Sequence, residues 1–161
     1  MLFAGVSSLT LLKMLRYKII DPGSYPRMPI NILIADDYED NRELLRLILT
    51  TAAYEVREAR DGRECLQMAK EHLPDLIMID LSMPVLDGWR VFRELKADER
   101  TNGIPCVAVT AYAEPDRGRA LRAGFSGYLS KPFRSGELLE TVRRLLLAGK
   151  VKVKAAESSE R

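Results

Sequence analysis

The feature of the sequence that most constrains its fold is a regular alternation of short apolar runs and longer amphipathic segments between residues 29 and 148. Five runs have the length and composition of β-strands, and a helical segment follows each of them: NILIAD, YEVREA, DLIMID, PCVAVTA and SGYLSK. The first, third and fourth runs are almost continuously apolar, as expected for strands buried on both sides. Because parallel strands need crossover connections, we expect an α/β fold with a doubly wound, five-stranded parallel sheet covered by helices on both faces.

Apolar residues in the expected helices recur at the spacing of a single helical face. The first helix is predicted to bury Leu44, Leu45, Ile48 and Ala52. The last helix is predicted to bury Leu138, Val142, Leu145 and Leu146. Asp61 is placed to cap the amino end of the second helix, with Glu64 three residues later in the capping-box position.

Length and composition predict one folded domain. The chain has 161 residues, of which 47% are hydrophobic and 30% charged, as in ordinary globular proteins. Lys and Arg number 25 against 23 Asp and Glu, so the total charge does not predict a nucleic-acid partner. Cys65 and Cys106 fall on a predicted helix and strand, and the chain has no secretory features. We therefore expect free buried thiols and a cytoplasmic location.

The two ends of the chain differ from the alternating part. Residues 1–28 open with an apolar run from Leu2 to Leu12, shorter than the roughly 20 residues of a membrane span, so no stable membrane insertion is expected. This leader is either disordered or an amphipathic helix that touches a membrane or a partner. The charged segment 149–161 predicts a disordered tail without an output domain. The folded domain is therefore expected at residues 29–148.

Polar side chains stand at the carboxyl ends of four predicted strands. Asp36 and Asp37 end the first strand, Asp80 the third, Thr110 the fourth and Lys131 the fifth. In a doubly wound sheet these ends share one edge, and ligands bind there at the point where the strand order reverses. With the order 2-1-3-4-5, that point lies between the first and third strands. The three aspartates are therefore expected to converge.

Three neighbouring carboxylates repel one another unless a cation offsets their charge. All-oxygen ligands suit a hard ion such as Mg²⁺, which is usually bound by one or two carboxylates together with a phosphate group. Lys131 adds a point charge that can pair with phosphate or with an aspartate. Asp80 is alone on its strand and is the candidate nucleophile, because aspartyl phosphates are a recognised covalent intermediate. The sheet edge thus predicts a site that accepts a phosphoryl group.

The segments IADD, MIDLSMPVLDGW, VAVTAY and GYLSKPF resemble the receiver domain of two-component response regulators, over residues 30–148. The resemblance is to stand-alone receivers of the chemotaxis and cell-division regulator type, and it implies a flavodoxin-like (βα)5 fold. It implies that Asp80 is the phosphoacceptor and that Thr110 and Lys131 bind the phosphoryl group. Tyr128 matches the switch aromatic of the family, and the Lys131–Pro132 bond is expected to be cis. The ligands implied for Mg²⁺ or Mn²⁺ are Asp36 through water, Asp37, Asp80 and the Ser82 backbone carbonyl.

As a receiver, the chain is expected to accept a phosphoryl group from a sensor histidine kinase or a histidine phosphotransfer protein. It is not expected to be an enzyme in any other sense, since it would catalyse only its own phosphorylation and dephosphorylation. The resemblance implies that Thr110 and Tyr128 then move, and that the surface of residues 113–131 and of the last helix binds a downstream protein. Two alternatives stay open: a phosphorelay intermediate that returns the group to a histidine phosphotransfer protein, and a pseudo-receiver that binds without phosphorylation.

Other interpretations fit the residues less well. A flavin-binding protein of flavodoxin type would need a phosphate cradle after the first strand, where this chain has the acidic segment DDYEDN. A hydrolase would need a second carboxylate two residues after Asp80, where Ser82 stands. The expected switch surface is rich in arginine, which favours an acidic partner if these side chains are not merely solvated: Arg117, Arg119, Arg122, Arg134, Arg143 and Arg144.

Overall fold

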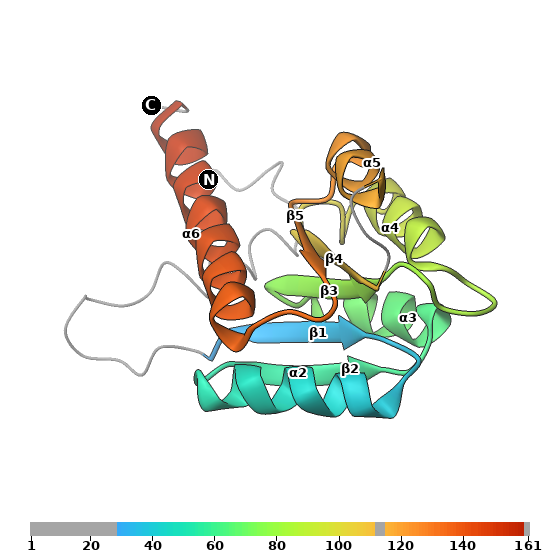
Figure 1. Ribbon diagram of the computed structural model, residues 1–161. Coiled ribbons are helices and arrows are strands. Elements are labelled where there is room, and N and C mark those ends of the chain that lie inside the picture. Colours follow the sequence, from blue (N-terminus) through green and yellow to red (C-terminus); the bar gives the residue numbers. More distant parts are fainter. Residues whose placement is uncertain (1–28, 112–114, 160–161) are drawn as a thin grey trace.

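A computed structural model describes residues 29–111 and 115–159. Five parallel strands form one sheet in the order β2-β1-β3-β4-β5, which confirms the predicted fold class (Figure 1). The strands are β1 (Asn31–Ala35), β2 (Glu55–Ala59), β3 (Leu76–Asp80), β4 (Cys106–Thr110) and β5 (Gly127–Ser130). The helices are α2 (Glu39–Thr51), α3 (Gly62–His72), α4 (Gly88–Ala97), α5 (Pro115–Ala123) and α6 (Ser135–Ser159).

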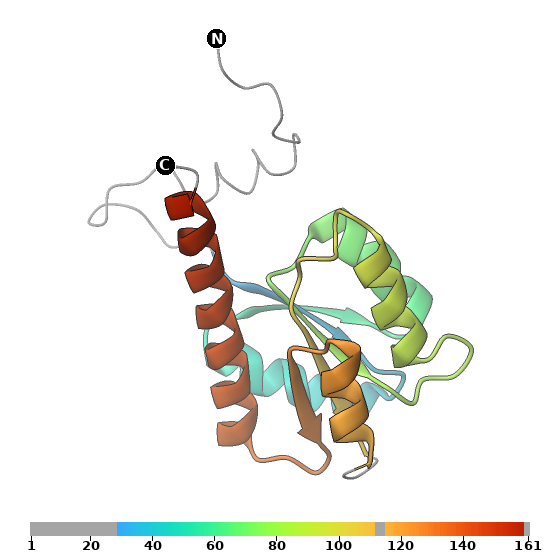
Figure 2. The same ribbon diagram turned by 90° about the horizontal axis from the view of Figure 1, so that it is seen from above.

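Two apolar layers cover the faces of the sheet. Helices α2 and α6 lie on one face, and α3, α4 and α5 lie on the other (Figure 2). Successive side chains of a strand point to opposite faces, so Ile32 and Ile34 of β1 enter the first layer while Leu33 and Ala35 enter the second. All residues of the central strand β3 are buried. This two-sided burial is the reason why the central strands are continuously apolar.

Helix α2 buries only part of the predicted face, and it also buries Leu49, which was not predicted. Leu45 and Leu49 are 2% and 0% exposed, whereas Leu44 is 50% exposed. Ala52 lies just past the last helical residue and is exposed, while Ile48 is half-buried against the core. Apolar residues lie on several sides of this helix, so spacing alone did not select the face that packs on the sheet. In α6 the predicted stripe is confirmed, with three of its members buried and the fourth half-buried.

The cap of α3 is close to the predicted one. The Asp61 carboxylate accepts a hydrogen bond from the Glu64 amide at 2.9 Å, which confirms Asp61 as the cap. The Glu64 carboxylate accepts the Arg60 amide at 2.7 Å. A capping box would instead use the amide of the capping residue, so the return bond falls one residue earlier than expected.

The last helix is longer than predicted. It continues to Ser159, so the structure differs from the expected disordered tail that begins at residue 149. The segment KVKVKAA is rich in lysine and alanine, which favour helix, and contains no proline that would end it. The predicted leader, residues 1–28, lies outside the described residues. Among the helices of residues 29–111 and 115–159, none is long and apolar enough to cross a bilayer.

Candidate functional site

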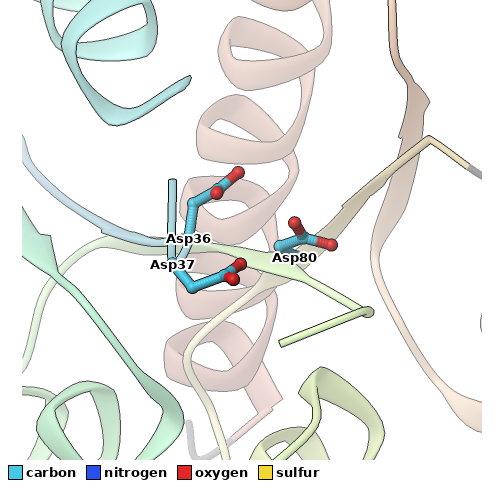
Figure 3. Close-up of side chains that lie close together, drawn as sticks. All are labelled: Asp36, Asp37 and Asp80. Atoms are coloured by element: carbon cyan, nitrogen blue, oxygen red, sulfur yellow. The ribbon is translucent and has the colours of Figure 1, made fainter. Parts of the chain in front are cut away.

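The register of the central strands brings the three predicted aspartates together. Ala35 of β1 pairs with Ile79 of β3, so the residues that follow each of them leave the sheet side by side. Carboxylate oxygens of Asp36, Asp37 and Asp80 lie within 4.8 Å of one another (Figure 3). Asp36 is 1% exposed and Asp80 is 6% exposed. The predicted convergence of these carboxylates is therefore present in the fold.

Lys131 reaches the same edge from the neighbouring strand pair. Thr110 of β4 pairs with Ser130 of β5, which sets Lys131 just beyond the sheet. Its Nζ donates to Asp36 Oδ2 at 2.6 Å and to Asp80 Oδ2 at 3.1 Å. Burial lowers the pKa of the Lys131 ammonium, but the hydrogen bonds and negative charges of Asp36 and Asp80 outweigh it and raise the pKa above its usual value. Lys131 is therefore a charged partner of both aspartates.

The surroundings of the Asp80 carboxyl disfavour its ionised form and raise its pKa. Burial raises its pKa, and the Asp36 charge raises it further. The Ser82 amide, which donates to Asp80 Oδ1 at 2.9 Å, and the Lys131 ammonium act in the opposite direction without cancelling the effect. The pKa of Asp80 thus lies above its usual value. A further cation beside Asp80 would favour its ionised form.

Asp37 provides a test of whether a metal ion fits the site. Its Oδ1 is buried and accepts no hydrogen bond from any residue in the described part of the chain. A buried carboxylate oxygen without a partner is costly, and a hard cation would satisfy it. The donor set consists of carboxylate oxygens, which suit Mg²⁺ or Mn²⁺. The residues present therefore fit the predicted ion.

The remaining predicted residues lie around this centre. Thr110 is fully buried at the end of β4, and its carbonyl accepts the Lys131 amide at 2.8 Å. Tyr128 is half-buried on β5 and packs against the layer that contains α3, α4 and α5. The Ser82 amide contacts Asp80 while its side chain faces solvent. The Lys131–Pro132 peptide bond is cis, as predicted.

The loop between β3 and α4 is anchored beneath the site and strained at its tip. Gly88 approaches the Asp80 carbonyl so closely that a Cβ atom there would collide with it. Val85 is 86% exposed and has a φ of 67°, a left-handed conformation that β-branched residues rarely adopt. The anchors are three buried apolar side chains: Leu81, Met83 and Leu86. The loop, which begins directly after Asp80, therefore presents Val85 to solvent.

Two contacts at the site were not predicted from the sequence. The Asn41 side-chain amide donates to both carboxylate oxygens of Asp36, at 3.3 and 3.2 Å. Arg42 Nη1 donates to the Asp36 backbone carbonyl at 2.8 Å. No spacing rule links these residues to a strand-end aspartate, because the contact depends on how α2 is oriented on the sheet.

Comparison with known proteins gives a consistent result. The model of the response regulator receiver domain family matches residues 32–143. The polar-differentiation response regulator DivK of Brucella anthropi is 38% identical over 120 residues, which are 74% of this chain and 98% of that protein. The family match falls on the part of the chain that forms the sheet and the carboxylate cluster.

Solved structures agree with the sequence matches. The chemotaxis protein CheY4 of Vibrio cholerae is 30% identical with a TM-score of 0.69, covering 73% of this chain and 99% of that one. The receiver domain of a sensor histidine kinase from Pseudomonas aeruginosa is 33% identical with a TM-score of 0.69, covering 74% of this chain and 98% of that one. That receiver domain was solved with a magnesium ion coordinated in its active-site cleft.

Proposed function

Because the chain belongs to the receiver domain family of two-component response regulators, a family of signalling domains, we propose that Asp80 is its phosphoacceptor. The observation that carries the proposal is the position of Asp80, which ends β3 within 4.8 Å of two further carboxylates and in contact with Lys131. We propose that residues 29–148 form the unit that is phosphorylated, and that residues 1–28 are a leader that the chemistry does not need.

The reaction is a transfer between two side chains. A carboxylate oxygen of Asp80 attacks the phosphorus of a phosphohistidine, the O–P bond forms, and the N–P bond breaks with its electron pair left on the imidazole nitrogen. A Mg²⁺ or Mn²⁺ ion bound by Asp37, Asp80, the Ser82 carbonyl and, through water, Asp36 would offset the charge of the reacting groups. Lys131 and the Thr110 hydroxyl are proposed to bind the phosphoryl oxygens. Hydrolysis of the acyl phosphate returns the Asp80 carboxylate.

The output proposed for this site is a change of partner binding. Thr110 at the end of β4 turns toward the phosphoryl group, and Tyr128 on β5 follows it, so the surface of α5, β5 and α6 is altered. Arg119 of α5 is already engaged, because its guanidinium lies 4.3 Å from the ring centre of Trp89. In the described part of the chain, the exposed arginines without an ion pair include Arg117 and Arg122. These side chains favour a downstream protein with an acidic surface, and a cytoplasmic location fits such signalling. The near balance of 25 Lys and Arg against 23 Asp and Glu does not predict nucleic acid as the partner.

A phosphorelay role is the second candidate, and it requires a docking surface for a histidine-bearing partner beside the phosphoacceptor. A cavity of about 350 Å³ opens beside the site and is largely apolar. Its lining includes Leu44, which is 50% exposed, and it reaches Lys131. The lining residues are Asn41, Leu44, Leu45, Ala111, Lys131, Pro132 and Phe133. An apolar groove next to the phosphoacceptor suits docking of a histidine-bearing helical bundle, from a kinase or a histidine phosphotransfer protein.

The test is the intact mass of the purified chain after incubation with acetyl phosphate and Mg²⁺. We expect a gain of one phosphoryl mass that is absent from Asp80→Ala and from a metal-free sample. Asp40→Ala is the matched control, because Asp40 is an exposed aspartate of α2 outside the cluster. No gain in the wild-type chain under any condition would contradict the proposal and leave a pseudo-receiver. Transfer of the gained group to a histidine phosphotransfer protein would favour the relay over the binding switch.

A further inference from the structure

Asp36 is held by donors on both of its carboxylate oxygens. Oδ2 accepts a hydrogen bond from Lys131 Nζ at 2.6 Å, and Oδ1 accepts one from the Tyr38 amide at 2.9 Å. The Asn41 side-chain amide donates to both oxygens, at 3.3 Å from Oδ1 and 3.2 Å from Oδ2. A carboxylate offers about four acceptor positions, so these donors leave Asp36 little capacity for a direct bond to a cation.

Asp37, the neighbouring aspartate, has a carboxylate oxygen that is still available to a cation. Asp37 Oδ1 is buried without a hydrogen-bond donor from the described residues. Asp80 uses Oδ1 for the Ser82 amide and Oδ2 for Lys131, and each of these oxygens keeps acceptor capacity for a second partner. The adjacent aspartates 36 and 37 therefore differ in availability although they are chemically identical.

We propose that Asn41 is a positioning residue, which holds the Asp36 carboxylate against Lys131 and thereby leaves Asp37 and Asp80 to bind a divalent cation directly. This rests on the proposed function, since it concerns the same cation site. An amide suits the task because it donates a hydrogen bond without adding charge. A cationic side chain at position 41 would repel the metal ion, and a carboxylate would add to the repulsion among the aspartates.

Arg42 holds the backbone of Asp36, so the effect of Asn41 on the Asp36 side chain can be tested separately. Its Nη1 donates to the Asp36 carbonyl at 2.8 Å, and its Nε lies 3.9 Å from the Glu58 carboxylate of β2. Consecutive residues of α2 thus hold the side chain and the main chain of one aspartate. Loss of the Asn41 amide alone is expected to release the Asp36 carboxylate while Arg42 keeps the backbone in place.

The experiment is a calorimetric titration of the full chain with Mg²⁺ and no phosphodonor. Asp36 is the proposed ligand that reaches the ion through water. Removing an outer-shell partner of a ligand typically weakens metal binding about 10- to 100-fold, so Asn41→Ala is expected to bind Mg²⁺ about 10-fold more weakly than wild type. Asn41→Gln keeps the amide donor and is expected to recover part of the loss. Leu47→Ala is the control on the same helix, because Leu47 is 60% exposed. Thermal unfolding without Mg²⁺ checks that each variant folds.

Unchanged Mg²⁺ affinity in folded Asn41→Ala would overturn the proposal, as would an Asn41→Gln variant no better than Asn41→Ala or an equal loss in Leu47→Ala. If Asn41→Ala fails to fold, Asn41→Leu, which is close to asparagine in size, is titrated under the same expectations. A wild-type chain that binds no Mg²⁺ would overturn this proposal together with the metal assignment. A wild-type chain that binds Mg²⁺ but gains no phosphoryl mass would overturn only the proposed function.

Discussion

The apolar layers on the faces of the sheet and the polar edge where its strands end are only a few residues apart, yet they act on stability in opposite directions. In the layers, side chains such as Ile34 and Ile77 are 0% exposed, and apolar burial stabilises by about 25 cal/mol per Å². At the edge, Asp36 and Asp80 are almost as deeply buried, but burying a charge is costly unless it is paired. The apolar layers therefore stabilise the fold, whereas the buried carboxylates at the edge of the sheet lower the free energy of unfolding.

Removing a buried side chain from an apolar layer is expected to have the largest effect on the free energy of unfolding. Leu49 of α2 is 0% exposed and belongs to the apolar layer that α2 and α6 form on the sheet. Leu49→Ala is expected to lower the free energy of unfolding in urea by about 2–5 kcal/mol, because it leaves a cavity. The folded fraction should still gain the phosphoryl mass. Leu47→Ala, at an exposed position of the same helix, should stay within about 0.5 kcal/mol of wild type. Loss of phosphorylation in folded Leu49→Ala would mean that the carboxylate site depends on the packing of the apolar layer.

Removing the cation of the edge is expected to have the next largest effect. Lys131→Met leaves the Asp36 and Asp80 oxygens without their shared donor, at a cost of about 1–3 kcal/mol in the metal-free state. Mg²⁺ should stabilise this variant more than it stabilises wild type, because the ion supplies the missing positive charge. Urea unfolding with and without Mg²⁺ measures both effects. Lys70→Met removes a surface ion pair with Asp98 and is the control. If Lys70→Met lowers the free energy of unfolding as much as Lys131→Met does, the ion pairs of Lys131 are no stronger than an ordinary surface ion pair.

The edge also predicts a variant that is more stable than wild type. Since folding raises the pKa of Asp80, this carboxyl contributes stability that is fully present below its unfolded pKa of about 3.9 and is lost as the pH rises through the folded pKa. Asp80→Asn cannot ionise, so without metal it is expected to unfold at higher urea than wild type at neutral pH. The difference should shrink as the pH falls toward about 4.

The control for this effect is another aspartate. Asp40 lies exposed in the first turn of α2, where a negative charge favours the helix, so Asp40→Asn is expected to be slightly less stable than wild type. Urea midpoints across this pH range compare the two variants directly. An Asp80→Asn variant that is less stable than wild type at neutral pH would show that the buried carboxylate is not a cost.

The smallest expected effect concerns the loop tip beside the edge. A left-handed conformation costs a non-glycine residue about 1–2 kcal/mol, and glycine loses about 0.5–1 kcal/mol through its greater freedom when unfolded. Val85→Gly is therefore expected to raise the free energy of unfolding by up to about 1 kcal/mol, and little burial is lost because Val85 is 86% exposed. Val85→Ala keeps the Cβ atom and should show no gain. Equal stability of the two variants would argue against strain at this position.

The sheet and the main site residues could be predicted because they depend on local order along the chain. Alternating apolar runs and helical segments already imply a parallel sheet, and residues at strand ends must then share its edge. Asp36, Asp80 and Lys131 were identified in this way, and their carboxylate and ammonium groups do meet. The cap at Asp61 was equally accessible, because a cap joins residues only three positions apart.

Contacts that depend on how one element is oriented on another were decided only by the tertiary structure. Leu44 and Leu49 are both apolar residues of α2, but the docking of this helix buries Leu49 and leaves Leu44 beside the cavity. The same docking turns Asn41 and Arg42 toward Asp36. A helix of this composition could present several faces, and the choice follows from packing against strands that are distant in sequence. The amino-acid order by itself therefore determined the sheet and its acidic edge, whereas side-chain packing across elements decided which oxygens remain available for a metal ion.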